Sequence, residues 1–264
     1  MALPLITADE LVSRLASDLA HVRREQPRAR PYLAFDADGT LWSGDVGEEG
    51  FAQALSGRVL LPAAGPALRE VARAHGIAED DDVHRQAELL WQAHTAGRLP
   101  ERDAYMLMSW GFAGRRPDEM LAFAERVITG RGAGSRHHAE LAPVLDWARG
   151  ERLELWVVSA SPQAIVEQGV RRLGIGRHTV LAMRPRVVDG LLAPELEGFV
   201  TYADGKADAL ARTLTDGVLL AAFGDNSFDV AMLRQARHPV AVRPKPALLD
   251  HPELPDSIVQ LIPA

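Results

Sequence analysis

The chain has 264 residues, of which 47% are hydrophobic and 25% are charged, and its formal net charge is −7. These values are typical of one or two globular domains with a substantial core, and the acidic balance argues against nucleic acid or an anionic membrane as the main partner. The absence of cysteine excludes disulfides, thiolate zinc sites and cysteine nucleophiles.

The beginning of the chain predicts a helix and then a strand. Residues 1–7 have neither a basic segment nor a long apolar one, so we expect no secretory signal, and no apolar run approaches the ~18 residues of a membrane span. The expected location is the cytoplasm. A Thr-x-x-Glu capping pattern and helical apolar spacing predict a helix over 7–24, and the apolar segment 32–35 predicts the first strand.

Two carboxylates follow this strand directly. Asp36 and Asp38 flank one small residue, and Gly39 turns the chain after them. Strand side chains alternate between faces, so residues two apart are expected to face one spot. Two like charges ~4 Å apart repel by roughly 4 kcal/mol at an effective dielectric near 20, and a hard divalent cation with oxygen ligands would relieve that repulsion.

The Asp-x-Asp-Gly pattern has two ordinary explanations. A calcium loop of the EF-hand type needs glycine at its sixth position and glutamate at its twelfth, where this chain has Leu41 and Gly47, so that type is excluded. A simple strand-to-turn exit remains open on these residues alone. The segments further along the chain weigh against it.

The stretch from 45 to 130 is helical in pattern, with no β-branched run to interrupt it. A glycine-rich segment, 130–135, follows and is predicted to be a flexible linker, because it lacks the Gly-Lys-Ser/Thr ending of a phosphate-binding loop. The predicted helices cover 47–56, 64–75, 80–96, 101–111 and 117–129.

Strand patterns return after residue 150 and alternate with helices, which predicts a parallel sheet covered on both faces. The predicted fold class is α/β: a Rossmann-like core, residues 1–44 and 135–264, with an α-helical cap domain, residues 45–134, inserted after the first strand. The strands are expected at 153–158, 179–183, 218–223 and 239–242, the helices at 162–173, 206–214 and 228–235, an Asp-Gly hairpin at 187–192 and a last edge strand at 257–262.

Further polar side chains fall at the ends of these strands. Ser159 follows one strand, Lys206 opens a helix, and Asp225 and Asp229 flank another helix start. Helix capping or solvation explains each of them alone. Ligands of open α/β sheets bind outside the carboxyl ends of the strands, so together these residues predict one site. There the four aspartates would bring four negative charges to one point, offset by Lys206 and a divalent magnesium.

Four segments in chain order carry a family resemblance. The segments that contain Asp36 and Asp38, Ser159, Lys206, and Asp225 resemble motifs I to IV of the haloacid dehalogenase superfamily. The helical insertion after motif I resembles a cap of that superfamily, and the phosphoserine phosphatase-like branch is the most similar one.

The resemblance implies a role for each motif residue. Asp36 would be the nucleophile that forms an aspartyl-phosphate, and Asp38 would protonate the leaving oxygen and then activate water. Mg²⁺ is the one cofactor implied, bound by the carboxylates of Asp36 and Asp225 and by the backbone carbonyl of Asp38. Phosphoryl oxygens would be held by Ser159 and Lys206, with Asp229 and Asn226 supporting the metal's ligands and Lys206 from behind.

The chain also departs from that branch. Phosphoserine phosphatases hold the substrate's ammonium with a glutamate and its carboxylate with a cap arginine, where this chain has Asp45 and, near the arginine position, Met106. An unpaired substrate carboxylate is costly, so phosphoserine is not expected as the main substrate. Trp42 is expected either to face the cleft as a substrate contact or to pack against the cap, and the His137–His138 pair is read as surface.

The predicted function is a magnesium-dependent phosphatase that hydrolyses a small phosphorylated metabolite. Dehalogenation needs no acid for the leaving group, so Asp38 favours phosphoryl chemistry. The alternatives are a phosphotransferase that uses the same intermediate and a catalytically silent phosphate-binding regulatory module, which would lack Asp36 or Asp38. We expect a monomer or homodimer with neither nucleic acid nor membrane as partner.

Overall fold

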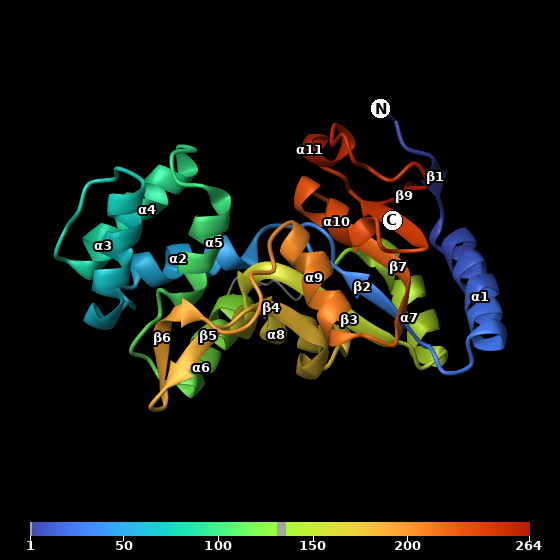
Figure 1. Ribbon diagram of the computed structural model, residues 1–264, viewed down its shortest axis with the longest axis horizontal. Helices are drawn as coiled ribbons and strands as arrows, with labels where there is room; N and C mark the ends of the chain where they lie inside the picture. The colour runs from blue at the N-terminus through green and yellow to red at the C-terminus, as the bar shows by residue number, and fades with distance from the viewer. Residues whose placement is uncertain (1, 131–135) are drawn as a thin grey trace.

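A parallel seven-stranded sheet forms the centre of the protein, whose computed structural model describes residues 2–130 and 136–264 (Figure 1). The predicted linker, apart from Gly130, lies outside the described residues. The strand order is β1-β9-β8-β7-β2-β3-β4, and every neighbouring pair is parallel. The strands are β1 Leu5–Ile6, β2 Arg30–Phe35, β3 Glu154–Pro162, β4 Val180–Met183, β7 Gly217–Gly224, β8 His238–Val242 and β9 Val259–Leu261.

Helices cover both faces of the sheet, as the continuous apolar strands predict. Leu33 and Phe35 of β2 join the buried cluster that contains Leu15, whereas Ala34 joins the cluster that contains Leu210. This alternation follows from the two-residue period of a strand. One face carries α1 Ala8–Glu25, α7 Ala142–Gly150 and α8 Gln163–Val170, and the other carries α9 Asp204–Thr213, α10 Val230–Leu233 and α11 Pro246–Leu249.

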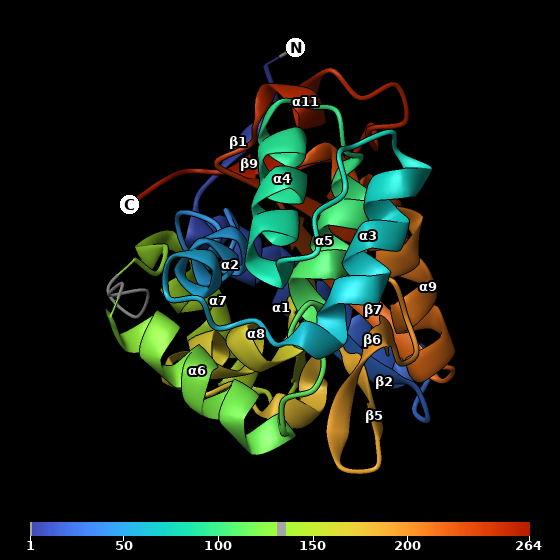
Figure 2. The same ribbon diagram turned by 90° about the vertical axis from the view of Figure 1, so that its left-hand side faces the viewer.

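A helical insertion, residues 46–130, separates β2 from β3 and extends to one side of the sheet (Figures 1 and 2). Its last helix packs against α8, so the buried core is continuous from the insertion to the sheet. No helix in the described part of the chain has the length and hydrophobicity of a membrane span. The insertion consists of α2 Val46–Ser56, α3 Gly65–Ala74, α4 Val83–Thr95, α5 Glu101–Trp110 and α6 Pro117–Gly130.

The predicted hairpin is present, as the antiparallel strands β5 Pro185–Val188 and β6 Leu191–Leu196. Asp189 and Gly190 both have positive φ at its turn, as an Asp-Gly hairpin turn requires. The hairpin packs against the insertion, because the backbone of Leu192 exchanges hydrogen bonds of 2.8 Å with Gly114 and Arg115. A segment in the predicted core range therefore supports the insertion.

The sequence prediction misses or misplaces three elements. Strand β1 has only two residues, too few for a pattern to show, and it pairs with β9 at the edge of the sheet, so the predicted edge strand is wrong about its position. The predicted helix over 228–235 is the short turn η6 Ser227–Asp229 followed by the four-residue α10. Further 3₁₀ turns are η1 Pro62–Ala64, η3 Ala139–Leu141, η4 Arg171–Leu173 and η5 Arg177–Thr179.

Candidate active site

The carboxyl ends of β2, β3 and β7 surround a cavity of about 270 Å³. Strand β2 lies between the other two, so side chains that follow these three strands converge there. The structure brings to this cavity the predicted site residues Asp36, Asp38, Asp45, Ser159, Lys206, Asp225, Asn226 and Asp229.

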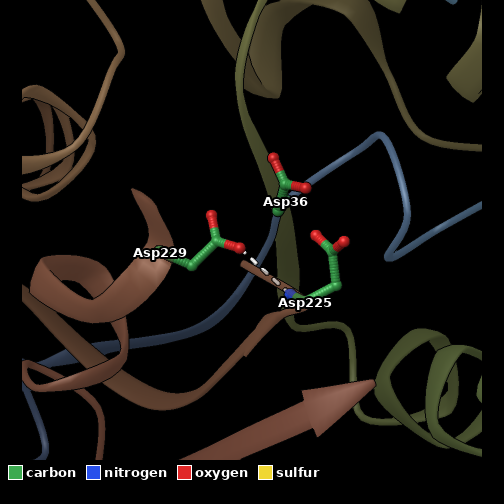
Figure 3. Close-up of side chains that lie close together, drawn as sticks. All are labelled: Asp36, Asp225 and Asp229. Atoms are coloured by element: carbon green, nitrogen blue, oxygen red, sulfur yellow. Dashed lines mark hydrogen bonds between the residues drawn. The ribbon is translucent and has the colours of Figure 1, made fainter. Parts of the chain in front are cut away.

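Three of the aspartates form a compact buried group. Carboxylate oxygens of Asp36, Asp225 and Asp229 lie within 4.8 Å of one another (Figure 3). The orientation of the Asp229 side chain is fixed by the backbone, because its Oδ2 accepts hydrogen bonds of 3.0 Å from the N–H groups of Asp225 and Asn226. Asp229 thus caps the tight turn after β7 with its Oδ2, and its Oδ1 points toward the cavity.

Lys206 bridges two members of this group. Its Nζ donates hydrogen bonds to Asp36 Oδ1 at 2.5 Å and to Asp229 Oδ1 at 2.6 Å. The side chain is 3% exposed. Burial alone lowers the pKa of Lys206, but the charges of Asp229 and Asp36 outweigh burial and leave the pKa above its ordinary value. Lys206 is therefore a permanent cation in the site.

The group still carries more negative than positive charge. Burial, then the charge of Asp229, raises the pKa of Asp36 well above its ordinary value although Lys206 opposes the rise. Burial and Asp229 likewise raise the pKa of Asp225. A further cation would favour the ionised forms. Clustered carboxylates are hard oxygen donors, so the group suits a hard divalent metal.

The backbone next to this group is shaped for close approach. Gly39 has φ +82°, and a Cβ atom at that position would lie 2.2 Å from Asp225 Oδ2. Only glycine allows the turn after β2 to pass so near the carboxylate. The backbone between Asp38 and Gly39 therefore borders the same space as the acids, which agrees with the donor set proposed for a metal there.

Asp38 occupies a different environment from the other acids. Its Oδ1 accepts hydrogen bonds of 2.8 Å from Trp42 Nε1 and from the Val46 N–H, and its Oδ2 accepts one of 2.6 Å from Ser161 Oγ. Three of the four acids expected around one point thus form the compact group, and Asp38 lines the same cavity beside it. Burial raises the pKa of Asp38 although these hydrogen bonds lower it, which suits a proton donor.

Trp42 does not face the cavity, and its role as a substrate contact is corrected. The side chain is 1% exposed, and its ring packs so tightly that a Cβ at Gly169 would lie 2.9 Å from it. Its single polar atom donates to Asp38, so Trp42 orients that carboxylate from within the core. No local pattern in the sequence distinguishes the two sides of the turn.

Met106 and the histidine pair also differ from expectation. Met106 and its neighbour Tyr105 both pack against the core cluster, but of the two only Tyr105 lines the cavity, because successive helix residues point about 100° apart. His138 is buried and its Nδ1 donates to the Thr40 carbonyl at 2.9 Å, so it is not a surface residue. A polar side chain that satisfies a buried carbonyl leaves no pattern in the sequence.

Asp45 lies at the cavity and also begins α2. Its Oδ1 accepts from the Glu48 N–H at 2.8 Å, and its Oδ2 accepts from the Tyr105 hydroxyl at 3.4 Å. Burial, then the charge of Asp38, raises the pKa of Asp45 well above its ordinary value. The position where the resemblance predicts a glutamate is thus occupied by Asp45, an acid whose negative charge has few compensating partners.

The sequence prediction missed two polar residues of the site, Ser161 and Lys245. Ser161, two residues after Ser159, donates to Asp38, and the Nζ of Lys245 lies 2.8 Å from Asp225 Oδ2. Ser159 itself is buried, and its Oγ accepts from the Ser161 N–H at 3.1 Å. Lys245 follows the end of β8. Because ligands of such sheets bind at the carboxyl ends of the strands, the segment after the predicted strand 239–242 could have indicated this residue.

Comparisons with known proteins give one family match. Residues 33–234 match the family model described as haloacid dehalogenase-like hydrolase. No curated protein matches the chain.

Solved structures share the fold at low sequence identity. A protein of unknown function from Bordetella pertussis Tohama I is 21% identical, with 84% of this chain and 94% of that chain covered and a TM-score of 0.63. One from Anaerococcus prevotii is 13% identical, with 92% and 87% covered and a TM-score of 0.63. A phosphoserine phosphatase with a phospho-aspartyl intermediate analogue is 18% identical, with 88% and 93% covered and a TM-score of 0.51.

Proposed function

Because this chain belongs to the haloacid dehalogenase-like hydrolase family, we propose that it is a Mg²⁺-dependent phosphatase that hydrolyses a small-molecule phosphomonoester through an aspartyl-phosphate intermediate. One observation carries the proposal: two aspartates after a single strand occupy two different environments. Asp36 lies beside Lys206 in the acidic group, whereas Asp38 is held apart by hydrogen-bond donors. Such a difference in environment supports the proposal of a nucleophile and a separate acid.

Asp36 takes the part of the nucleophile. Its carboxylate forms a bond to phosphorus while the bond from phosphorus to the leaving oxygen breaks. Lys206 keeps the carboxylate in place and offers positive charge to the phosphoryl oxygens, and Ser159 offers a hydroxyl to them. Phosphoryl transfer depends mainly on such positioning and charge stabilisation.

Asp38 supplies and removes the proton. In its neutral form it protonates the leaving alcohol oxygen, and as a carboxylate it then accepts a proton from the water that attacks the aspartyl-phosphate. Ser161, Trp42 and the Val46 N–H hold the carboxyl group in one orientation through both steps. The products are inorganic phosphate and the free alcohol.

Mg²⁺ would be held by the carboxylates of Asp36 and Asp225 and by the backbone carbonyl of Asp38. When bound, it neutralises charge on the acids and on the phosphoryl oxygens. Asp229 and Asn226 keep Lys206 and the turn after β7 in position behind these ligands.

Mg²⁺ is expected to raise the melting temperature of metal-free protein. A ligand present at 100 times its Kd stabilises the native state by about 2.7 kcal/mol, or roughly 5–10 °C for a chain of this size. Differential scanning calorimetry with chelator-treated protein measures the shift. Asp225→Asn should abolish it and the exposed Asp146→Asn should retain it; no shift at saturating Mg²⁺ contradicts the proposed metal site.

A panel of phosphorylated metabolites, each assayed with Mg²⁺ and with chelator, tests the function. Release of phosphate that depends on Mg²⁺ supports it, and no release from any ester contradicts it. The competing phosphotransferase function is tested in the same assay by adding acceptor alcohols. A phosphorylated product that forms in place of free phosphate would identify a transferase.

Asp38→Asn is expected to slow hydrolysis of alkyl phosphates about 10²- to 10⁴-fold, because the leaving oxygen loses its proton donor. With p-nitrophenyl phosphate, whose leaving group needs little protonation, formation of the intermediate is affected less than its hydrolysis. Phosphoenzyme should therefore accumulate, which mass spectrometry of acid-quenched protein detects. A variant that hydrolyses alkyl phosphates at the wild-type rate would refute the assignment.

A further inference from the structure

The cavity contains an unequal set of charges. Five aspartates and two lysines line it in the described part of the chain. Both lysines already have carboxylate partners: Lys206 pairs with Asp36 and Asp229, and Lys245 pairs with Asp225. The other two acids form no ion pair within the described residues.

Those two acids differ in how well they are satisfied. Asp38 accepts three hydrogen bonds and has its part in the chemistry. Asp45 accepts from one backbone N–H and, at 3.4 Å, from the Tyr105 hydroxyl. Its neighbour Glu48 adds a further negative charge, faced by His94 at 3.2 Å. Of these two acids, Asp45 therefore accepts fewer hydrogen bonds, and the one to its Oδ2 is long at 3.4 Å.

An aromatic surface lies next to Asp45 and joins the insertion to the core. Tyr105 and Phe228 line the cavity, and the ring of Tyr202 lies between theirs, at centroid distances of 6.1 and 4.6 Å. The Tyr202 hydroxyl donates to Glu101 of α5 at 3.2 Å, which fixes this arrangement. Aromatic faces beside a carboxylate attract organic ammonium groups.

The backbone before α9 holds Tyr202 in place. Ala203 has φ +49°, an uncommon conformation for a residue with a Cβ, and a Cβ at Gly205 would lie 1.9 Å from the Val200 carbonyl oxygen. Strained backbone of this kind is concentrated at functional sites. The same short segment carries Tyr202, whose ring packs against Tyr105 and Phe228, and Lys206, which pairs with Asp36.

A substrate carboxylate has no partner here. No arginine lines the cavity in the described residues, and both lysines are engaged with aspartates. A carboxylate near Asp45 would meet like charge in a half-buried space, which disfavours binding.

We propose that the ester hydrolysed at this site is the phosphate of an amino alcohol without a carboxylate, whose ammonium group binds between Asp45 and the rings of Tyr105, Tyr202 and Phe228. This inference rests on the phosphatase function proposed above and names its substrate class. The phosphate would lie at Asp36 and the ammonium group at Asp45, so one small molecule would bind at both ends of the cavity.

The experiment compares two esters that differ in charge alone and two that differ by a carboxylate group. In the presence of Mg²⁺, kcat/KM is measured for phosphocholine and for its neutral isostere 3,3-dimethylbutyl phosphate, and for phosphoethanolamine and O-phosphoserine. We expect the cationic ester to exceed its isostere by about tenfold, and phosphoethanolamine to exceed phosphoserine. The order of phosphocholine and phosphoethanolamine shows whether a quaternary or a primary ammonium is preferred.

Asp45→Asn tests the residue itself. The amide keeps an acceptor for the helix cap but removes the charge, so the ratio of cationic to neutral kcat/KM should fall to about one. Asp103→Asn is the matched control, because it removes the same charge from α5 at a residue that pairs with His75 at 3.0 Å and does not line the cavity. That variant should keep the wild-type ratio.

Each outcome separates the inference from the function beneath it. Equal rates for cationic and neutral esters overturn the substrate class and leave the phosphatase intact, whereas no hydrolysis of any ester overturns both. An unchanged ratio in Asp45→Asn also overturns the inference. Should Asp45→Asn fail to fold, Phe228→Leu replaces it, with the expected result a lower ratio for phosphocholine and an unchanged ratio the contrary one.

Discussion

Replacing Asp36 by asparagine is expected to reduce hydrolysis of every phosphomonoester at least ~1,000-fold, to the background rate. Asparagine has nearly the shape of aspartate, but its amide is a poor nucleophile and cannot form the acyl phosphate. The steady-state kcat/KM for p-nitrophenyl phosphate and for the best ester of the panel measures the loss. No phosphoenzyme should be trapped from this variant.

The control must show that the loss is chemical. Circular dichroism and thermal unfolding of Asp36→Asn should match a folded protein, since burial makes the negative charge at this position unfavourable in the metal-free state. Asp146→Asn, a change at a 74% exposed side chain on α7, should keep wild-type activity. A fully active Asp36→Asn protein would mean that another group attacks phosphorus.

Much of the fold follows from the periodic spacing of apolar residues in the sequence. The continuous apolar segments that became β2, β3 and β7 and the helical spacing between them predict a parallel sheet with covered faces. The site follows from one further rule, that ligands lie at the carboxyl ends of such strands. Asp36 and Asp225 could therefore be placed together from the sequence alone, and the family resemblance implies their roles.

What could not be predicted depends on contacts between distant segments. The direction of Trp42 is set by packing against Gly169, and that of Asp38 by the hydroxyl of Ser161, 123 residues further on. The two-residue strand β1 exists only because β9 pairs with it. Neither a short strand nor a buried hydrogen bond produces a local pattern, so such features appear only in the structure.

The aromatic surface near Asp45 likewise depends on contacts between distant segments. Tyr105, Tyr202 and Phe228 come from α5, the loop before α9 and η6, which lie far apart in the sequence. Each looks like an ordinary core residue by itself. The fold brings the three rings together and places Tyr105 and Phe228 in the cavity with Asp45, so the proposed selectivity for an ammonium group could not be predicted from the sequence.

Lys206→Met is expected to remove activity and also to destabilise the fold. The lysine is 3% exposed and is the one cation within hydrogen-bond reach of both Asp36 and Asp229 in the described residues, so its removal leaves two buried carboxylates unpaired. Breaking a buried ion pair from one side costs about 3–5 kcal/mol, or roughly 10 °C in melting temperature. Lys245→Met is the matched comparison: its side chain is 53% exposed and it pairs with one buried carboxylate, Asp225, so its loss should cost less than that of Lys206.

The pH dependence of Lys206→Met tests the cause of this destabilisation. Burial and the charge of Asp229 already raise the pKa of Asp36 in the native protein, and loss of the lysine removes the charge that opposes the rise. An acid whose pKa is higher in the native than in the unfolded state favours folding when protonated, and that advantage is lost as pH increases above the unfolded value of about 3.9. The gap in melting temperature between variant and wild type should therefore be largest at neutral pH and shrink as pH falls toward 4. A gap that is independent of pH would mean that lost packing, and not uncompensated charge, causes the destabilisation.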